Sequence, residues 1–135
     1  GNLCRYAITK ITKRRFRDMN EDNEKRIWGH FTVLYDTGNV KLKELYVEPS
    51  RCLSYQRHNK RNEFWVVQRG VARVVLNDSD KIEKDVTKIL EVGDTISIPV
   101  GWWHQVVNIG SEPLVIVETQ YGLDCDENDI ERRFQ

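Results

Sequence analysis

The chain has 135 residues, of which 39% are hydrophobic and 31% charged, as expected for one globular domain and too apolar for a disordered chain. Lysine plus arginine and aspartate plus glutamate each total 21, so the formal net charge is zero. Because nucleic-acid-binding proteins usually carry a basic excess, this balance argues against a nucleic-acid partner, while a local basic pocket for a small anion stays compatible with it.

The sequence also bears on the cellular compartment. No stretch has the apolar length needed to span a membrane, and no apolar core follows the basic N-terminus as it would in a signal peptide. The cysteines Cys4, Cys52 and Cys125 match neither a disulfide framework nor a zinc-finger spacing, which favours reduced thiols. We therefore expect a cytoplasmic protein without a membrane partner.

The first 25 residues are highly charged and are interpreted as an extension ahead of a single domain over residues 26–135. Within the extension, segment 3–17 alternates weakly between apolar and polar residues, which leaves an edge strand and a short helix both open.

From Trp28 onward the chain consists of short runs rich in valine, isoleucine, leucine and aromatic residues, separated by turn residues. We predict strands at 31–35, 40–47, 53–57, 63–68, 71–77, 81–86, 88–90, 95–99, 105–108 and 114–119. No helical period separates these runs, so an all-β sandwich, jelly roll or barrel is expected. The charged residues 124–135 form a tail or a short helix starting near Asp126.

Four residues are candidate metal ligands: Gln56, His58, Glu63 and His104. Gln56 and His58 are two residues apart and project from one face of a strand. Glu63 follows after a short polar connection that lets the chain reverse, and His104 joins them if its strand lies alongside. An amide oxygen, two imidazoles and a carboxylate suit Zn, Fe, Mn, Co or Ni better than Ca or Mg.

The residues around these candidates form two longer strings. Residues 56–70 read Q-x-H-x(4)-E-x(6)-G, and residues 93–108 read G-x(5)-P-x-G-x(2)-H-x(3)-N. Together they resemble the two motifs of the cupin superfamily, with Gln56 in place of the first histidine. The resemblance implies a single cupin-type jelly-roll β-barrel that binds one divalent metal through the four candidates.

The glutamine at position 56, where most cupins have histidine, narrows the resemblance to one group within the superfamily. Segment 53–58 is similar to the L-S-x-Q-x-H motif of phosphomannose isomerases, and segment 98–104 to I-P-A-G-x-x-H. Residues 26–133 as a whole resemble the C-terminal isomerase domain of the type II enzymes, which combine mannose-1-phosphate guanylyltransferase and mannose-6-phosphate isomerase activities. The resemblance implies zinc as the metal and mannose 6-phosphate as the substrate. Asn59, Lys60 and Phe64 replace histidines that are frequent in the family.

Isomerisation of a sugar phosphate requires a base, an electrophile and cationic groups that hold the phosphate. Lys43 and Ser54 match family positions near the substrate, and Arg61 is a further substrate-binding candidate. Glu118 and Arg132 are the catalytic candidates. Glu118 would act as a base, because burial would raise its pKa. Arg132 would donate two hydrogen bonds to the phosphate group. Each of these residues also has a purely structural interpretation, as a solvated, ion-paired or hydrogen-bonded side chain.

Other functions stay open at this point. The aromatic residues Tyr55, Trp65, Trp102 and Trp103 could line a carbohydrate pocket, fill the core or form a dimer interface. A non-catalytic module binding a sugar or sugar nucleotide is the main alternative to an isomerase. A metal-dependent dioxygenase is less favoured because such enzymes prefer histidine-rich ligation. The cupin resemblance further implies a homodimer.

Overall fold

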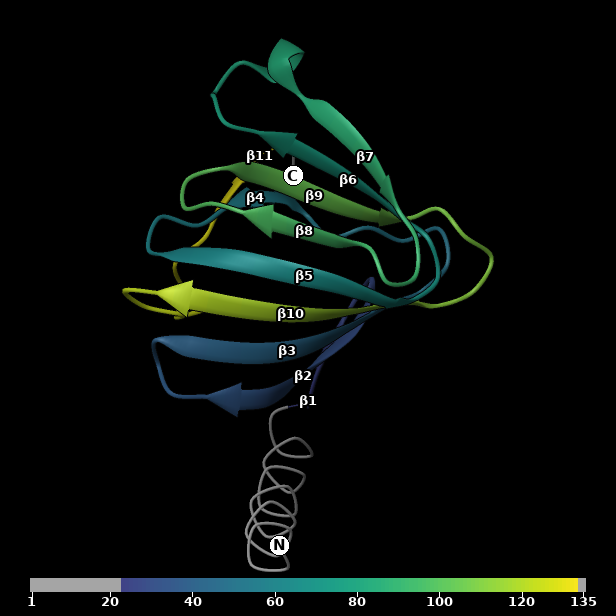
Figure 1. Ribbon diagram of the computed structural model, residues 1–135, viewed down its shortest axis with the longest axis horizontal. Helices are drawn as coiled ribbons and strands as arrows, with labels where there is room; N and C mark the ends of the chain where they lie inside the picture. The colour runs from purple at the N-terminus through teal and green to yellow at the C-terminus, as the bar shows by residue number, and fades with distance from the viewer. Residues whose placement is uncertain (1–22, 134–135) are drawn as a thin grey trace, which may run out of the picture.

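The structure, a computed structural model, describes residues 23–133, which form two antiparallel β-sheets packed into a barrel (Figure 1). Segment 3–17 and most of the charged N-terminal extension lie outside the described residues. The expected all-β jelly-roll architecture is confirmed. Within residues 23–133 there is no long apolar helix capable of crossing a membrane.

The larger sheet contains β1 (Asn23–Arg26), β2 (Gly29–Asp36), β3 (Val40–Val47), β10 (Leu114–Gly122), β5 (Arg61–Arg69) and β8 (Thr95–Ile98), in that spatial order. The smaller sheet contains β11 (Glu131–Arg133), β4 (Tyr55–Arg57), β9 (Trp103–Asn108), β6 (Ala72–Asn77) and β7 (Val86–Leu90). Strand β10 lies between β3 and β5, so a late segment of the chain runs through the middle of the larger sheet (Figure 1).

The inward faces of the central strands change from apolar to polar along their length. Side chains alternate between the two faces of a strand, so every second residue of β3, β5 and β10 points into the barrel. On β10 the inward residues are Leu114 and Ile116, then Glu118 and Gln120. The barrel therefore has an apolar end and a polar end.

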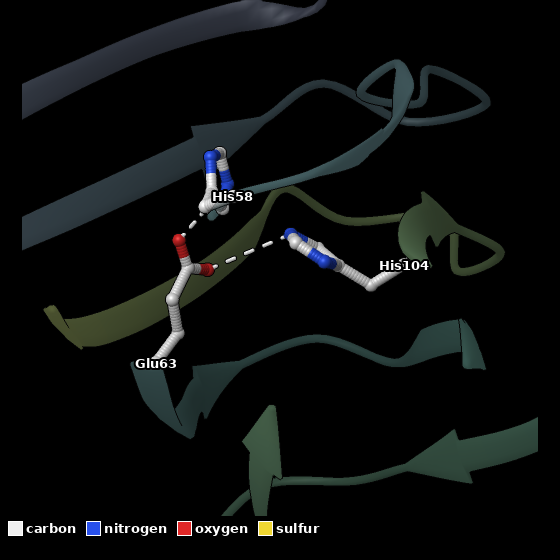
Figure 2. Close-up of side chains that lie close together, drawn as sticks. All are labelled: His58, Glu63 and His104. Carbon is white, nitrogen blue, oxygen red and sulfur yellow. Dashed lines mark ion pairs between the residues drawn. The ribbon is translucent and has the colours of Figure 1, made fainter. Parts of the chain in front are cut away.

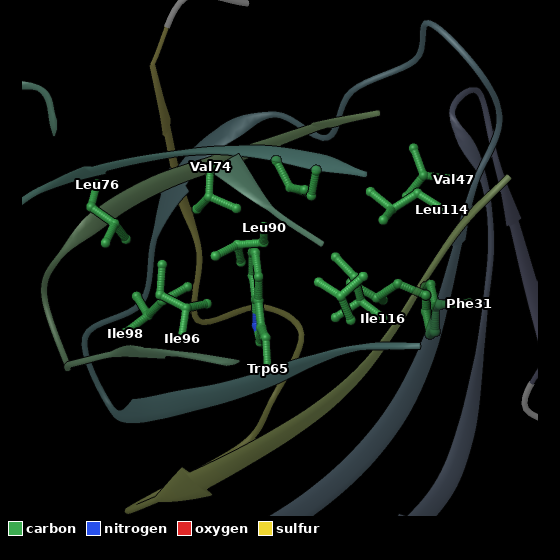
Figure 3. Packing of buried hydrophobic residues seen from close by; sticks show 14 residues of the cluster. Phe31, Val47, Trp65, Val74, Leu76, Leu90, Ile96, Ile98, Leu114 and Ile116 are labelled. Atoms are coloured by element: carbon green, nitrogen blue, oxygen red, sulfur yellow. The ribbon is translucent and has the colours of Figure 1, made fainter. Parts of the chain in front are cut away.

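The apolar end holds a cluster of buried side chains contributed by both sheets (Figure 3). Trp65 is 1% exposed and packs at its centre, and Val47, Leu114 and Ile116 are fully buried. Burial of apolar surface is the main stabilising term in folding, so this cluster is the main source of the barrel's stability. It borders the polar end at Trp65, whose Nε1 donates to Glu63 Oε1 at 3.1 Å.

One local prediction is wrong. Residues 81–86 were expected to form a strand, but Ile82–Lys84 form a short 3-10 helix (η1) and β7 begins only at Val86. The Asn77 amide donates to the Lys81 carbonyl and to the Asp85 carboxylate, and these bonds fix a turn where a strand ladder would otherwise run.

Of the two alternatives left open for residues 124–135, a tail or a short helix starting near Asp126, the described residues form the tail, which runs irregularly into β11. Side chains from the barrel occupy the backbone carbonyls that a helix would use. Lys41 donates to the Cys125 carbonyl, Arg61 to the Asp126 carbonyl and His58 to the Asp129 carbonyl. The segment thus lies as a strap across the polar end of the barrel.

A glycine at the end of β10 permits a close approach beside the polar end. A Cβ atom at Gly122 would lie 2.4 Å from the Lys60 carbonyl oxygen, well inside van der Waals contact. Only glycine therefore lets β10 pass so close to the connection that carries His58 toward β5.

Candidate metal centre

Three of the four predicted ligands converge at the polar end of the barrel (Figure 2). His58 lies in the turn between β4 and β5, Glu63 on β5 and His104 on β9. The Nε2 atom of His58 is 3.2 Å from Glu63 Oε2, and the Nε2 atom of His104 is 3.6 Å from Glu63 Oε1. One ligand atom from each residue lies within 4.8 Å of the others, as a shared ion requires.

The fourth predicted ligand, Gln56, lies beside this triad. Gln56 pairs directly with His104 across β4 and β9, so their side chains share a face. The Gln56 side-chain oxygen accepts a hydrogen bond from the Ser54 hydroxyl at 3.0 Å. The fold therefore places both Gln56 and Ser54 next to the triad, and the Ser54 hydroxyl contacts Gln56, not the triad, through its hydrogen bond.

Backbone carbonyls orient both histidine rings. The Nδ1 atom of His58 lies 2.7 Å from the Asp129 carbonyl oxygen, and that of His104 lies 3.1 Å from the Trp102 carbonyl oxygen. A carbonyl can only accept, so each Nδ1 carries the proton and each Nε2 is directed at Glu63. Metal-binding histidines in proteins are commonly held in this way.

Burial and neighbouring charges set the ionisation of the triad. Burial alone would raise the pKa of Glu63, but the adjacent His58, His104 and Arg61 hold that pKa well below its usual value. Burial lowers the pKa of His104 to about 4, against the opposing charge of Glu63. An ionised carboxylate and a neutral imidazole are the forms that bind a metal.

His104 Nε2 tests whether a metal fits. This atom is buried and has no hydrogen-bond partner among the described residues, although an unsatisfied buried polar atom normally costs free energy. A metal ion would satisfy it. Two imidazole nitrogens and a carboxylate, with an amide oxygen nearby, form a donor set suited to a divalent transition metal.

Arg61 is part of this centre. It is 4% exposed, its Nε donates to Glu63 Oε2 at 3.1 Å, and its Nη2 lies 3.3 Å from His58 Nε2. A metal bound by the triad would take the Nε2 lone pair of His58 that now faces this guanidinium, while the Glu63 carboxylate has oxygens for both the metal and Arg61. Its predicted role in substrate binding stays a prediction.

A cavity of about 550 Å³ opens beside the triad. Its cationic lining residues are Arg26, Lys43, Arg51, Arg61 and Arg132, against the two acidic residues Glu118 and Glu127. Lys43 forms an ion pair with Glu127, and Arg61 with Glu63. Within residues 23–133, Arg51 and Arg132 have no ion-pair partner, so their charges are available to an anion in the cavity.

The catalytic candidates both line this cavity. Glu118 is 5% exposed and stands between Lys43 and Trp65 in the β3–β10–β5 register. Burial, assisted by repulsion from Glu63, raises the pKa of Glu118 to about 8. Arg132 is paired with Gln56 across β11 and β4, so Arg132, Gln56 and His104 form one row across the smaller sheet. Their proximity places both candidates at the site, and their catalytic roles stay predictions.

The aromatic residues near the motifs are mainly structural. Trp65, Trp103 and Tyr55 are buried, and Trp102 packs against the core. The aromatic side chains that line the cavity are instead Trp28 and Phe31. Of the three alternatives left open for the four motif-adjacent aromatics, the structure supports packing in the core, and none of the four lines this cavity.

Sequence reasoning missed Gln120 and the orienting role of Asp129. Gln120 lies opposite Glu63 in the β10–β5 register and lines the cavity. Residues 114–120 read as four apolar residues followed by three polar ones, so the sequence shows neither which of the polar residues faces inward nor which strand lies beside them. Asp129 acts through its backbone carbonyl, which no residue-type pattern reveals.

Comparison with protein families gives a direct match. The model of the mannose-6-phosphate isomerase C-terminal family matches residues 14–135. The alginate biosynthesis protein AlgA of Pseudomonas aeruginosa is 35% identical over 107 residues, which are 79% of this chain and 21% of AlgA. A mannose-1-phosphate guanylyltransferase of Sinorhizobium fredii is 33% identical over 132 residues, 98% of this chain and 24% of that protein. The chain thus spans only a fifth to a quarter of these relatives.

Solved structures share the fold at lower identity. The capsular polysaccharide assembling protein CapF of Staphylococcus aureus has a TM-score of 0.72 at 18% identity, over 82% of this chain and 33% of CapF. An oxalate decarboxylase of Lactobacillus farciminis has a TM-score of 0.70 at 20% identity, over 84% and 34% of the two chains. Fold, motifs and family model agree, and the chain is a cupin-type barrel that belongs to the mannose-6-phosphate isomerase C-terminal family.

Proposed function

We propose that this domain is a metal-dependent sugar-phosphate isomerase that interconverts mannose 6-phosphate and fructose 6-phosphate. The observation that carries the proposal is a buried carboxylate, Glu118, beside the His58–Glu63–His104 triad in a cation-lined cavity. The family and the mannose-related names of the relatives support the same substrate class.

The cavity offers a place for the phosphate group. Arg132 and Arg51 line it without ion-pair partners in the described part of the chain, and a guanidinium can bind a phosphate through two parallel hydrogen bonds. Lys43 is held by Glu127 and adds positive charge deeper in the cavity. We assign the phosphate to the Arg132 side, because Arg132 stands in one row with Gln56 and His104.

Isomerisation moves one carbon-bound proton between adjacent carbons. In the proposed reaction the Glu118 carboxylate takes the proton from C2, the electrons of the broken C–H bond form the C1–C2 double bond, and the electrons of the C1=O1 π bond move onto O1 to give an enediolate. A second proton passes from O2 to O1, and Glu118 returns its proton to C1, so that the ketose has the same atoms and charge as the aldose. Glu118 is suited to this because its surroundings make it a stronger base than an exposed carboxylate.

The triad residues, with Gln56, would hold the metal, and zinc is the expected ion. Such an ion, when bound, supplies a positive charge that stabilises the developing negative charge on the sugar oxygens. Lys43 and Arg61 add fixed charge to the same region, and the buried position of the site limits competition from water.

A coupled assay for conversion of mannose 6-phosphate to fructose 6-phosphate tests the proposal, using protein stripped of metal and then reloaded with zinc. We expect turnover only in the reloaded protein. The Glu118→Gln variant should bind zinc as the wild type does but lose at least about 100-fold in kcat, as is usual for a general base. Glu112→Gln, which alters an exposed carboxylate paired with Arg69, is the matched control. Zinc-loaded wild type without turnover would overturn the isomerase and favour a binding module.

A further inference from the structure

Among the described residues, two buried side-chain atoms lack a hydrogen-bond partner: His104 Nε2 and Gln120 Oε1. The first is accounted for by the metal centre. The second belongs to a residue that is 1% exposed and lines the same cavity. Because buried polar atoms in native proteins are nearly always satisfied, the Gln120 oxygen calls for a donor that residues 23–133 do not supply.

The Gln120 amide is held in place from one side. Its Nε2 donates to Glu118 Oε1 at 2.5 Å, and both residues point inward from β10 because they are two positions apart. This bond fixes the orientation of the amide and leaves Oε1 as the end without a partner. Gln120 also lies directly beside Glu63 in the β10–β5 register, so its oxygen is next to the metal centre.

The cationic donors near this oxygen are already engaged. Lys43 donates to Glu127, and Arg61 donates to Glu63 and to the Asp126 carbonyl. Lys41, which faces Gln120 across β3 and β10, donates to the Cys125 carbonyl at 2.9 Å. The missing donor therefore has to come from the contents of the cavity.

We infer that Gln120 is a specificity-determining residue, whose Oε1 accepts a hydrogen bond from one hydroxyl group of the bound sugar while Glu118 holds its amide. The inference rests on the proposed function for the class of ligand, a sugar phosphate. A neutral amide oxygen is suited to a hydroxyl, which always carries a donor, and not to the phosphate, which carries acceptors. A site built in this way discriminates against an analogue that lacks the hydroxyl, because the buried oxygen is then left unpaired.

The test compares binding of mannose 6-phosphate with that of its 2-deoxy, 3-deoxy and 4-deoxy analogues by calorimetry on zinc-loaded protein. We expect the wild type to bind one analogue more weakly by about 5- to 50-fold, the range for a buried oxygen left unpaired. The Gln120→Met variant, with a side chain of similar length, should bind mannose 6-phosphate more weakly than the wild type does, by the same factor. It should bind mannose 6-phosphate and that analogue equally, so the effects of the substitution and of the missing hydroxyl are not additive.

Gln68→Met, at an exposed position on β5, makes the same chemical change outside the cavity and should behave as the wild type. The zinc affinity of Gln120→Met should equal that of the wild type, and a loss would overturn the inference by making Gln120 a metal ligand. The wild-type measurements alone are decisive should the variant not fold. Equal binding of all analogues, or no binding of any sugar phosphate, overturns the inference. If the protein discriminates among the analogues but shows no turnover, the inference about Gln120 stands and the isomerase proposal fails. If it shows turnover but no discrimination, the isomerase proposal stands and the inference about Gln120 fails.

Discussion

A single nitrogen atom best identifies the metal centre at the scale of residues. His104 Nε2 is buried, faces Glu63 and has no hydrogen-bond partner in the described part of the chain, while its Nδ1 is fixed by the Trp102 carbonyl. His58 is arranged in the same sense by the Asp129 carbonyl. Both Nε2 atoms face one buried carboxylate, and that of His104 has no hydrogen-bond partner among the described residues. Leaving it unpaired without an ion costs free energy, because buried polar groups otherwise have to be paired.

We therefore predict that His104→Asn removes high-affinity zinc binding. The amide cannot place a donor atom where Nε2 lies, so the centre loses one of its four proposed protein ligands, and zinc affinity should fall by more than the roughly 10- to 100-fold typical of outer-shell changes. Calorimetric titration of the metal-free variant with zinc measures this affinity. His30→Asn alters the remaining histidine, which stacks on Tyr46 away from the triad, and should leave zinc affinity unchanged. Equal affinity in both variants would contradict the assignment.

The C-terminal segment 124–133 is the element that completes the site. Glu127 pairs with Lys43, the Asp129 carbonyl accepts from His58, and Arg132 lines the cavity. The segment is itself held in place at β11, where Glu131 accepts from Arg57 and the Arg133 guanidinium lies 4.0 Å from the centre of the Trp103 ring. One short stretch of chain thus orients the proposed metal ligand His58, pairs with the charge of Lys43 and supplies Arg132, the candidate hydrogen-bond donor to the phosphate.

Asp129 links this segment to the metal centre. Its carboxylate accepts hydrogen bonds from the backbone amides of Asn59 and Lys60, and its carbonyl orients His58. Asp129→Ala should release the segment locally and weaken zinc binding about 10- to 100-fold, as removal of outer-shell partners does. Asp124→Ala, which removes a carboxylate bonded within the same segment, is the control and should bind zinc normally. Zinc titration decides between them, and unchanged affinity in Asp129→Ala would mean that His58 is oriented without the segment.

How much of the site could be predicted from the sequence also differs from element to element. The spacing of His58, Glu63 and His104 identified the triad because the strings around them are local signatures, and inward Lys43 followed from its alternation with Leu45 on β3. The environment of Gln120 depends on β10 pairing between β3 and β5, a long-range register that alternation does not encode. The path of residues 124–130 depends on hydrogen bonds from side chains of distant strands, so their charged composition could not decide between a tail and a short helix.

At the scale of the whole molecule, the barrel separates stability from chemistry. The apolar cluster around Trp65, Leu114 and Ile116 closes one end, and the charged and metal-binding side chains occupy the other. A buried cluster of this kind stabilises the fold without an ion, in contrast to small metal domains that unfold when their metal is removed. At the polar end, His104 Nε2 is buried and unpaired among the described residues, so this is where an ion would add stability.

This separation predicts the response to metal removal. Stripped protein should keep its β-sheet circular dichroism and unfold cooperatively, and zinc at about 100 times its dissociation constant should add about 2.7 kcal/mol to the free energy of unfolding. For a domain of this size that corresponds to a rise of roughly 10 °C in Tm, measurable by thermal denaturation with and without zinc. The His58→Asn, His104→Asn double variant should show the lower Tm in both conditions. If stripping the metal abolished the β-sheet signal, the ion would be holding the barrel together, and the apolar end would not be sufficient to fold it.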